Sequence, residues 1–418
     1  MLYAQKVAAA LEEKRASFSR QEDTFGIALI AYRAALAELG EQFPSQSALE
    51  AHLAKQATPS GSQGGAIGAR PTHAYTPWAA AWSAGGVPVA PFGRAFAHHE
   101  AARTWAESVI TGTTTVAVDG SQIMPWRDAS IPVALVQAGI FVNPHDAAQP
   151  YVKDVQVEIL GPDDLSPPPE VADNEQQLQL AAEEIVNLHR FQLEARTLAQ
   201  WMRDWRPQRN TPAPLAILDG SLIVSFALTM PPKLRKAYVE AATDLLAASE
   251  ETRVPLIAYI DTSFARDLTT MLRAAFPERG LDDSKRIHDG LLWGDALAWG
   301  DAAVPWLSAR GDVLAAYGEQ SGSVAFTYMR AAADRPPARI ELPRWVVESD
   351  QYAHVLDVLR AELIVGNGYP YAIETADAVA VIAVADRARF YRMFQQFAET
   401  SGLPLSFSRK SLSKSRRR

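Results

Sequence analysis

Val116-Ala-Val-Asp-Gly-Ser121 and Leu215-Ala-Ile-Leu-Asp-Gly-Ser221 are two similar stretches, about a hundred positions apart, that each end an apolar, strand-like run in Asp-Gly-Ser. Strand exits are where α/β sheets form their ligand crevices, and a glycine there lets the backbone turn sharply or approach a ligand. Asp-Gly is also a common turn signal, and an aspartate after a strand often forms only an Asx-turn or a helix N-cap. The repetition favours a shared site at Asp119 and Asp219.

The segments around these stretches predict a mixed α/β sheet. Three strand-like segments with short connections, which predict an antiparallel meander, span residues 113–118, 133–142 and 151–160. Strands and helices then alternate, with strands at 215–218 and 256–260 and helices at 174–205, 233–249 and 264–275. Antiparallel strands followed by parallel strands across helices are typical of an RNase H-like fold. Strands at 324–329 and 339–342, a helix at 350–364 and an apolar stretch at 378–383 complete the pattern.

Composition changes along the chain predict four regions. Residues 1–57 are a helical N-terminal region with apolar spacing over 4–40, and residues 58–112 are a Gly/Pro/Ala-rich linker followed by a helix. Residues 113–400 form the α/β domain, and residues 401–418 form a basic tail. Its last ten residues carry six positive charges and no negative one. A solvated tail is the favoured interpretation, and a phosphate-attracting arm is the alternative.

The overall composition excludes several classes of protein. The chain has 418 residues, a formal net charge of −8 and no cysteine, which excludes disulfide scaffolds, thiolate metal sites and cysteine nucleophiles. The N-terminal sequence lacks the pattern of a secretory signal, and no apolar run is long enough for a membrane span. We therefore expect a soluble, cytoplasmic protein of about two or three domains.

Paired carboxylates predict metal chemistry. Asp119 and Asp219 would repel one another unless a cation lay between them, and Mg²⁺ or Mn²⁺ prefers carboxylate oxygens. Such ions activate water and stabilise a leaving oxygen in phosphodiester cleavage. A third acid is expected from the helix before Asp219, with Glu194 as the candidate. Glu183 and Glu184 are rival acids on the same helix, and Arg190 lies four positions before Glu194. Spacing alone favours a surface i,i+4 pair of Arg190 with Glu194.

Other chemically capable residues favour structural roles. Tyr328 is expected to pack, Glu341 to be a surface acid, and the lone His354 to be structural. His98 and His99 lack the spacing of a zinc-binding helix face. The tryptophans at 293, 299 and 306 suit burial in a core or a dimer interface better than base stacking. No P-loop, dinucleotide-binding or nucleophile-elbow motif is present.

The ordered motifs of the chain resemble those of the NurA-type nucleases, which act with the HerA-type hexameric DNA-translocating ATPase on DNA ends. The resemblance spans about residues 113–395 and is carried by Val118-Asp119-Gly-Ser, Leu193-Glu194-Ala, Leu218-Asp-Gly-Ser-Leu222, Ile257-Ala-Tyr-Ile260, Tyr369-Pro-Tyr371 and Ala376-Asp377. It implies an RNase H-like core in a homodimer and Mn²⁺-dependent DNA cleavage. By family resemblance the enzyme would be a 5′–3′ exonuclease and single-strand endonuclease that functions in DNA end resection and double-strand break repair.

The resemblance also implies roles for individual residues. The family's metal-binding aspartates and helical glutamate match Asp119, Asp219 and Glu194, and its late tyrosine matches Tyr369. A histidine commonly completes the family site, but Asp377 stands at the matching position. Aspartate can bind a hard cation but cannot act as an imidazole. Asp261 occupies another polar family position with a poorer match, and basic residues that include Arg266, Arg273 and Arg279, with the tail, are expected to form a DNA path.

Three alternatives remain open from the sequence. An actin-like phosphotransferase or ATPase shares the RNase H-like topology, although Gly-rich phosphate hairpins are missing around both Asp-Gly-Ser motifs. An aspartic protease also pairs two aspartates, but the helical pattern between the motifs is wrong for an all-β enzyme. A noncatalytic clamp that grips DNA or the motor is the third alternative, and it draws support from Asp377.

Overall fold

The computed structural model describes residues 2–56, 67–72, 86–126, 129–166, 175–207, 211–282 and 286–406. The chain forms two compact units, each built from separated segments. Unit 1 comprises residues 1–95, 260–315 and 322–348, and unit 2 comprises residues 96–259, 316–321 and 349–418. The basic positions 409–418 lie outside the described residues. None of the described helices combines the length and the apolar character that crossing a membrane requires.

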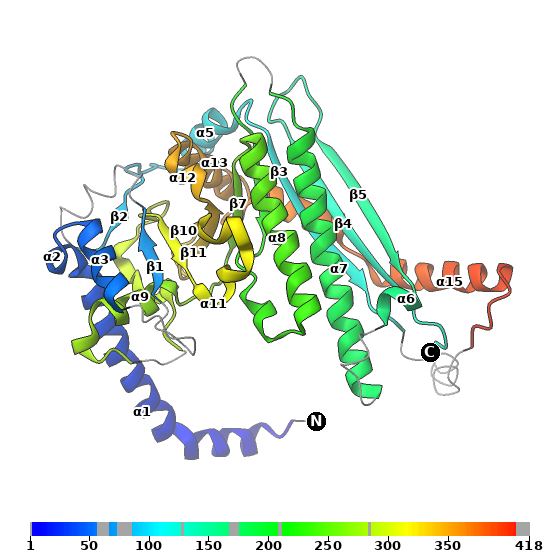
Figure 1. The fold of residues 1–418 in the computed structure, drawn as a ribbon, viewed down its shortest axis with the longest axis horizontal. Coiled ribbons are helices and arrows are strands. Elements are labelled where there is room, and N and C mark those ends of the chain that lie inside the picture. Colours follow the sequence, from blue (N-terminus) through cyan, green and yellow to red (C-terminus); the bar gives the residue numbers. More distant parts are fainter. Residues whose placement is uncertain are drawn as a thin grey trace. The chain divides into compact units, whose positions relative to one another are not determined.

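Unit 2 is built on a mixed five-stranded sheet with the strand order β5-β4-β3-β6-β7 (Figure 1). The strands are β3 (Thr115–Ile123), β4 (Ala134–Asn143), β5 (Val152–Leu160), β6 (Leu215–Asp219) and β7 (Leu256–Ile260). β3, β4 and β5 pair antiparallel, whereas β6 pairs parallel with both β3 and β7. The predicted mixed α/β arrangement, with antiparallel strands first and parallel strands after them, is confirmed.

Helices cover both faces of this sheet. The helices of the unit are α5 (His99–Ile110), α6 (Pro162–Leu165), α7 (Glu175–Asp204), α8 (Pro232–Thr252), α13 (Tyr352–Val365), α14 (Tyr371–Ala380) and α15 (Val384–Thr400). Gln122, an even-numbered residue of β3, donates to Asn187 on α7. Gln137, whose partner on β3 is the odd-numbered Ser121, donates to the Ala380 carbonyl on α14. Because successive side chains on a strand point to opposite faces, α7 and α14 cover opposite faces.

β3 is longer than the sequence predicts, and this changes the setting of Asp119. The pairing of β3 with β6 stops at Val118, but its pairing with β4 continues to Ile123. The expectation that Asp119 follows the end of its strand is therefore wrong. Antiparallel hydrogen bonds to β4 hold the Asp-Gly-Ser stretch in extended conformation after the parallel part has ended. Asp219, by contrast, is the last residue of β6, as predicted.

A buried carboxylate fixes the start of α14 to the sheet. Glu362 of α13 is 1% exposed, and its Oε1 accepts from Thr115 Oγ1 at 2.9 Å and lies 3.3 Å from His145 Nε2. Its Oε2 accepts from the Ala372 backbone N–H in the first turn of α14 at 2.8 Å. One side chain thus joins β3, the loop after β4 and α14, so the α14 residues are held at a fixed height against β3.

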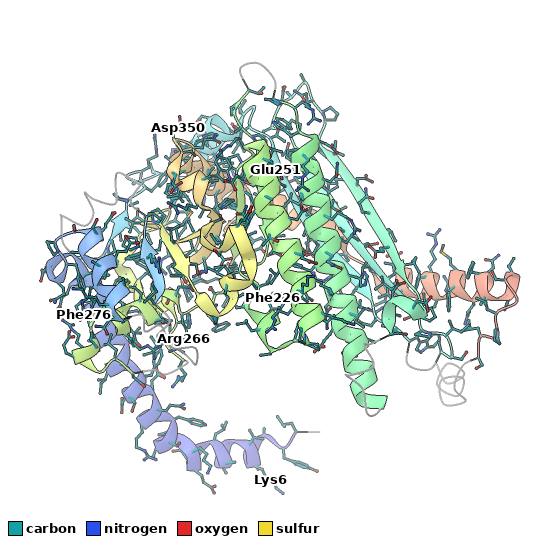
Figure 2. The ribbon with its side chains drawn as sticks, viewed as in Figure 1. Lys6, Phe226, Glu251, Arg266, Phe276 and Asp350 are labelled. Carbon is teal, nitrogen blue, oxygen red and sulfur yellow. The ribbon has the colours of Figure 1, made fainter. Side chains whose placement is uncertain are left out.

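Unit 1 combines helices with an antiparallel sheet in the order β1-β9-β10-β11. The strands are β1 (Gly68–Pro71), β9 (Trp306–Ala309), β10 (Val324–Met329) and β11 (Ala338–Pro343). The short strand β8 (Ala302–Ala303) also pairs with β10, and β2 (Val89–Ala90) pairs with β8. The helices are α1 (Ala4–Ala37), α2 (Leu39–Gln42), α3 (Gln46–Gln56), α9 (Asp267–Ala275), α10 (Asp289–Leu292), α11 (Gly311–Leu314) and α12 (Arg344–Glu348). Residues 2–24 are exposed, and Lys6 projects from this part of α1 in Figure 2.

The core of unit 1 contains aromatic side chains that the sequence placed in a core or an interface. Trp293 and Trp306 are buried, and Phe276 packs edge-on against Phe43 at 6.0 Å. Trp299 is half-buried and donates through Nε1 to the Ala331 carbonyl. Tyr328 is also buried, so its expected packing role is confirmed.

A cluster of buried charged residues crosses this core. Arg339 is 1% exposed, and its guanidinium lies 2.7 Å from Glu341 and 3.2 Å from Asp267. Asp289 lies 3.9 Å from the same guanidinium and accepts from two backbone N–H groups of the first turn of α9. The expectation that Glu341 is a surface acid is wrong, because its charge is compensated inside the unit by Arg339. We call Arg339, Asp267, Asp289 and Glu341 the Arg339 cluster.

Candidate functional site

Strand register places the two repeated aspartates side by side. Val118 on β3 is paired with Leu218 on the parallel strand β6, so Asp119 and Asp219 are the next residues in the same register. Residues in register on parallel neighbours point to the same face of a sheet. Asp219 is in turn paired with Tyr259 on β7. The sheet therefore presents Asp119, Asp219 and Tyr259 in one row across three strands.

Tyr369 lies over this row from the turn between α13 and α14. Its ring meets the ring of Tyr259 edge-on, with centroids 5.4 Å apart, and its hydroxyl donates to Asp219 Oδ1 at 3.2 Å. A side chain at Gly366 would place its Cβ 2.0 Å from the Tyr369 carbonyl oxygen. The glycine thus permits the tight turn that carries Tyr369, and the buried Tyr259 supports the phenol ring beside Asp219.

Asp377 reaches the row from α14. Its carboxyl group lies close enough to that of Asp119 to raise the pKa of Asp119, since a neighbouring carboxylate disfavours the ionised form. α14 approaches the sheet closely at Gly139, the β4 partner of Asp119, where a Cβ would lie 2.7 Å from the Ala380 backbone nitrogen. Asp377 itself is exposed, so this side of the site is open to solvent.

Glu194 approaches from the opposite face of the sheet, at Gly120, where the absence of a side chain leaves room for its carboxylate. A Cβ on Gly120 would lie 2.0 Å from Glu194 Oε1 and 2.8 Å from Arg190 Cγ. The carboxylate of Glu194 therefore occupies the space that any other residue at 120 would fill. Arg190 Nη1 lies 2.6 Å from Glu194 Oε1. Glu194 is only 4% exposed. The expectation that Arg190 and Glu194 form a surface pair is therefore wrong for Glu194, which is buried.

The electrostatics of the cluster favour the neutral forms of two acids. Burial, followed by repulsion from Asp219 and Asp377, raises the pKa of Asp119 to about 6, against the lowering effect of the Gly120 N–H. Burial likewise raises the pKa of Glu194 to about 7; Arg190 lowers it, and Asp119 and Asp219 raise it. Mutual repulsion shows that Asp119, Asp219 and Glu194 act on one another. We call Asp119, Asp219, Glu194, Asp377 and Tyr369 the acid cluster.

The donor atoms of the acid cluster suit a hard divalent cation, because carboxylate and phenol oxygens are what Mg²⁺ and Mn²⁺ prefer. Burial, together with the neighbouring acids, raises the pKa values of Asp119 and Glu194, and a bound cation would lower both. Across the described part of the chain, however, no three Asp, Glu or His side chains already surround one point closely enough to hold an ion. The residue types fit a metal, and the carboxylates must turn toward a common point to bind it.

Asp119 lies inside a strand and not in a simple Asp-Gly turn. Asp119 accepts from the N–H of Gly120 at 2.7 Å within a continuing strand, and Asp219 accepts from Tyr369. No described helix begins directly after either residue. Asp261 belongs to unit 1, where it pairs with Arg335 at 3.5 Å. His98 caps the N-terminus of α5 by accepting from the Ala101 N–H.

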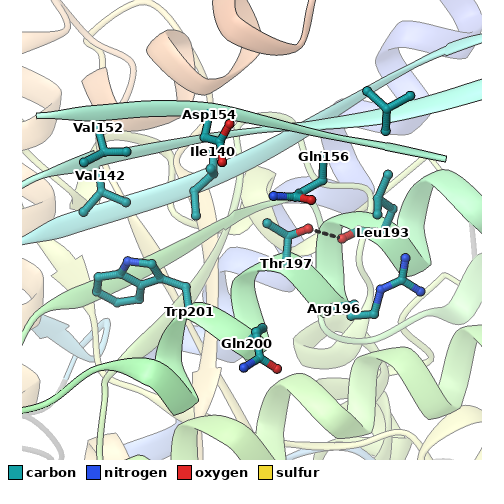
Figure 3. A pocket seen from close by; sticks show the side chains of 11 residues that line it. Ile140, Val142, Val152, Asp154, Gln156, Leu193, Arg196, Thr197, Gln200 and Trp201 are labelled. Atoms are coloured by element: carbon teal, nitrogen blue, oxygen red, sulfur yellow. Dashed lines mark hydrogen bonds between the residues drawn. The ribbon is translucent and has the colours of Figure 1, made fainter.

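A cavity of about 590 Å³ lies on the α7 side of the sheet (Figure 3). It is lined by Leu193, Arg196, Thr197, Gln200 and Trp201 of α7 and by Ile140, Val142, Val152, Asp154, Gln156 and Val157 of β4 and β5. None of the acid cluster lines it. The flank of α7 next to Glu194 is therefore hollow but separate from the acids.

The sequence contained weak signals for the supporting residues of this site. Gly120 directly follows Asp119, but its role as the entry point for Glu194 depends on a helix seventy positions away. Tyr259 stands at the end of an apolar run, where burial is the ordinary expectation. Glu362 lies in a helix without any motif. Long-range pairing, which local patterns do not specify, gives all three their positions.

The sequence of the chain matches a model of a known protein family. The family model described as the NurA domain matches residues 113–382, which is more than half of the sequence. The chain belongs to the NurA family. The matched range includes every residue of the acid cluster, and the family resemblance seen in the motifs is confirmed.

Similar solved structures include other NurA proteins. A crystal structure of NurA with manganese is 9% identical, with a TM-score of 0.37, and the match covers 71% of this chain and 92% of that one. NurA bound to dAMP and manganese is 9% identical, with a TM-score of 0.33 and coverages of 65% and 85%. Endonuclease V of Ciona intestinalis in complex with DNA is 10% identical, with a TM-score of 0.28 and coverages of 70% and 96%. No match was found among curated proteins.

Proposed function

We propose that this NurA-family chain is a divalent-metal-dependent deoxyribonuclease that hydrolyses phosphodiester bonds. The observation that carries the proposal is the convergence of Asp119, Asp219, Glu194, Asp377 and Tyr369, from distant parts of the sequence, at one edge of an RNase H-like sheet. Membership of the NurA family supports a nuclease role.

Asp119, Asp219 and Glu194 are the proposed ligands of Mn²⁺ or Mg²⁺. When bound, such an ion activates water for attack on the phosphodiester and stabilises the leaving oxygen. Tyr369 holds the Asp219 carboxylate through its hydroxyl, which fixes the direction of the aspartate oxygens. The edge-on packing of Tyr369 against Tyr259 restricts its ring. Positioning of this kind lowers the cost of ordering the site during the reaction.

Asp377 is proposed to exchange a proton with Asp119 in place of the histidine that is common in the family. Its carboxyl group raises the pKa of Asp119, and it is exposed to solvent. A group that faces both water and the acid cluster can carry a proton between them. The family histidine would do so as an imidazole, whereas Asp377 does so as a carboxylic acid.

The biological setting follows from family resemblance. We propose that the chain acts as a homodimer with a HerA-type hexameric motor ATPase, in the cytoplasm, in DNA end resection and double-strand break repair. A 5′–3′ exonuclease activity and a single-strand endonuclease activity are proposed on the same basis. Arg266, Arg273 and Arg279 of unit 1, with the basic tail, are proposed to contact the DNA backbone, since basic side chains bind phosphates independently of sequence.

Cleavage of linear DNA in the presence of Mn²⁺ tests the proposal. Asp119→Asn removes one carboxylate with little change in size, and Asp154→Asn on the exposed strand β5 is the matched control. We expect the first variant to lose at least about a hundredfold in rate, as removal of a key electrostatic group does, and the control to retain wild-type activity. Equal rates for wild type and Asp119→Asn would contradict the proposal.

A further inference from the structure

The Arg190 side chain, on α7, contacts the acid cluster. Its Nη1 lies 2.6 Å from Glu194 Oε1 and 3.5 Å from the Gly120 carbonyl oxygen. Its Cγ packs where a side chain at Gly120 would stand. Its Nε is buried without a hydrogen-bond partner among the described residues. The guanidinium is therefore held by one strong contact, and part of its hydrogen-bonding capacity is unused.

The contact compensates a buried charge. Glu194 is 4% exposed, and Asp119 and Asp219 both act on it with the same sign of charge. Arg190 opposes that repulsion. A buried carboxylate without a counter-ion is costly, so Arg190 offsets part of the cost of burying Glu194 beside two aspartates.

The same contact occupies an oxygen that a metal would need. Oε1 of Glu194 is the atom that both contacts Arg190 and lies where a side chain at Gly120 would stand. No three acids or histidines of the described chain yet surround a common point. Coordination of an ion through Oε1 would therefore require that carboxylate to turn away from the guanidinium.

We propose that Arg190 and the divalent metal compete for Glu194, and that the guanidinium released by metal binding becomes a ligand of the DNA phosphate. The inference rests on the proposed nuclease function. The Arg190 side chain is 31% exposed, so it has a path to solvent that Glu194 lacks. A guanidinium presents a planar set of donors that matches a phosphate in two-point contact. Metal binding thus both completes the site and frees a cation for the substrate.

Calorimetric titration of the full chain with Mn²⁺, together with the KM for linear DNA at saturating Mn²⁺, tests both parts. The variants are Arg190→Gln, Arg190→Lys and the control Arg196→Gln. Arg196 lies on the same helix with a 63% exposed side chain and pairs with Glu158 at 3.0 Å. We expect Arg190→Gln to bind Mn²⁺ about tenfold more tightly and to show a KM about tenfold higher, on the scale of a charged hydrogen bond. Arg196→Gln should change neither value.

Two further comparisons separate direct competition from a general field effect. In a Glu194→Gln background, Arg190→Gln should no longer tighten Mn²⁺ binding, because the carboxylate for which the two cations compete is gone. Arg190→Lys should keep more DNA affinity than Arg190→Gln, since it keeps the charge but loses the two-point geometry. It also carries the test if the glutamine variant does not fold.

Three results would overturn the inference. They are an unchanged or weaker Mn²⁺ affinity in Arg190→Gln, equal tightening in the Glu194→Gln background, and an unchanged KM for DNA. Failure of the underlying function has a different signature. In that case wild type would bind no Mn²⁺ that Asp219→Asn removes, whatever residue stands at position 190.

Discussion

The acid cluster of unit 2 and the Arg339 cluster of unit 1 are built from the same kinds of side chain but differ in access. In unit 1, Arg339 lies at the centre, within 4 Å of Asp267, Asp289 and Glu341, and all four are at most 2% exposed. In unit 2, Arg190 contacts Glu194 at one side, and the acids range from the buried Glu194 to the exposed Asp377. One cluster encloses its cation, and the other opens toward solvent.

The comparison teaches that a raised pKa alone does not identify a functional site. Burial and the neighbouring Asp267 raise the pKa of Asp289 to about 7 in unit 1, although this acid is sealed from solvent. In unit 2 the pKa values of Asp119 and Glu194 rise for related reasons, but there two acids of the cluster, Asp219 and Asp377, are exposed to solvent. Exposure to solvent, together with the alignment of Asp119, Asp219 and Tyr259 across three strands, distinguishes the site in unit 2.

Removal of Arg339, the central cation of the Arg339 cluster, should have the largest effect on the free energy of unfolding. Arg339→Met leaves three buried carboxylates around an apolar side chain, and breaking a buried charge network by one partner costs about 3–5 kcal/mol. We expect the free energy of unfolding in urea to fall by that amount. The matched change in unit 2, Arg190→Gln, should cost much less because its side chain is partly exposed. Similar losses for the two variants would remove the distinction between the clusters.

Filling the gap between Asp119 and Glu194 should have the next largest effect. Gly120→Ala puts a methyl group 2.0 Å from Glu194 Oε1, so α7 and β3 must separate or Glu194 must turn away, at a cost of about 1–3 kcal/mol. We expect DNA cleavage to be lost and the melting temperature to fall. Gly161→Ala is the control, since the atom nearest to the added Cβ there lies 3.8 Å away. Full activity of Gly120→Ala would show that Glu194 has no role in the site.

Loosening the support of α14 should have a comparable or smaller effect on stability and a clear effect on the site. Glu362→Ala removes the acceptor of both the Thr115 hydroxyl and the Ala372 N–H, and an unsatisfied buried group costs about 1–3 kcal/mol. We expect a lower free energy of unfolding and a lower kcat, because α14 carries Asp377. Hydrogen exchange of the first turn of α14 checks the mechanism; unchanged protection there would argue against it.

The pH dependence of the metal-free protein should give the smallest change. Asp119 and Glu194 have pKa values of about 6 and about 7, above their ordinary values of 3.8 and 4.5. A group whose pKa is raised on folding contributes stability below its unfolded pKa, and this contribution is lost as the pH rises through the folded pKa. The free energy of unfolding should therefore decline between about pH 4 and about pH 7.

Matched variants isolate this contribution from that of Asp289, which has the same sign. Asp119→Asn and Glu194→Gln should each flatten the decline in urea unfolding with a chelator present, and Asp154→Asn should leave it unchanged. A decline of equal steepness in all four proteins would mean that other groups cause it.

Much of the unit 2 sheet was predictable because its signals are local. The apolar runs at 215–219 and 256–260 have almost the bounds that the sequence predicts, and the repeated Asp-Gly-Ser stretches indicated which strands carry the site. The continuation of β3 to Ile123 was not predictable, because it depends on pairing with β4. The sequence identified α14 only as an apolar stretch after residue 378, since its polar residues face the acid cluster.

Charged residues were the least predictable. Helical spacing made Arg190 and Glu194 a surface pair, and strand alternation made Glu341 a surface acid, yet Glu194 and Glu341 are buried. In both cases a buried acid is stabilised by an arginine whose proximity is decided by tertiary packing. Sequence patterns report which faces are apolar, but they do not report which charges find a partner inside.

Diffraction at the manganese absorption edge, from crystals grown with Mn²⁺, tests the metal-site proposal most directly. The proposal predicts an anomalous peak between the carboxylates of Asp119 and Asp219, with Glu194 turned toward it and away from Arg190. A map without a peak there, in which Arg190 still contacts Glu194, would contradict the proposed metal centre.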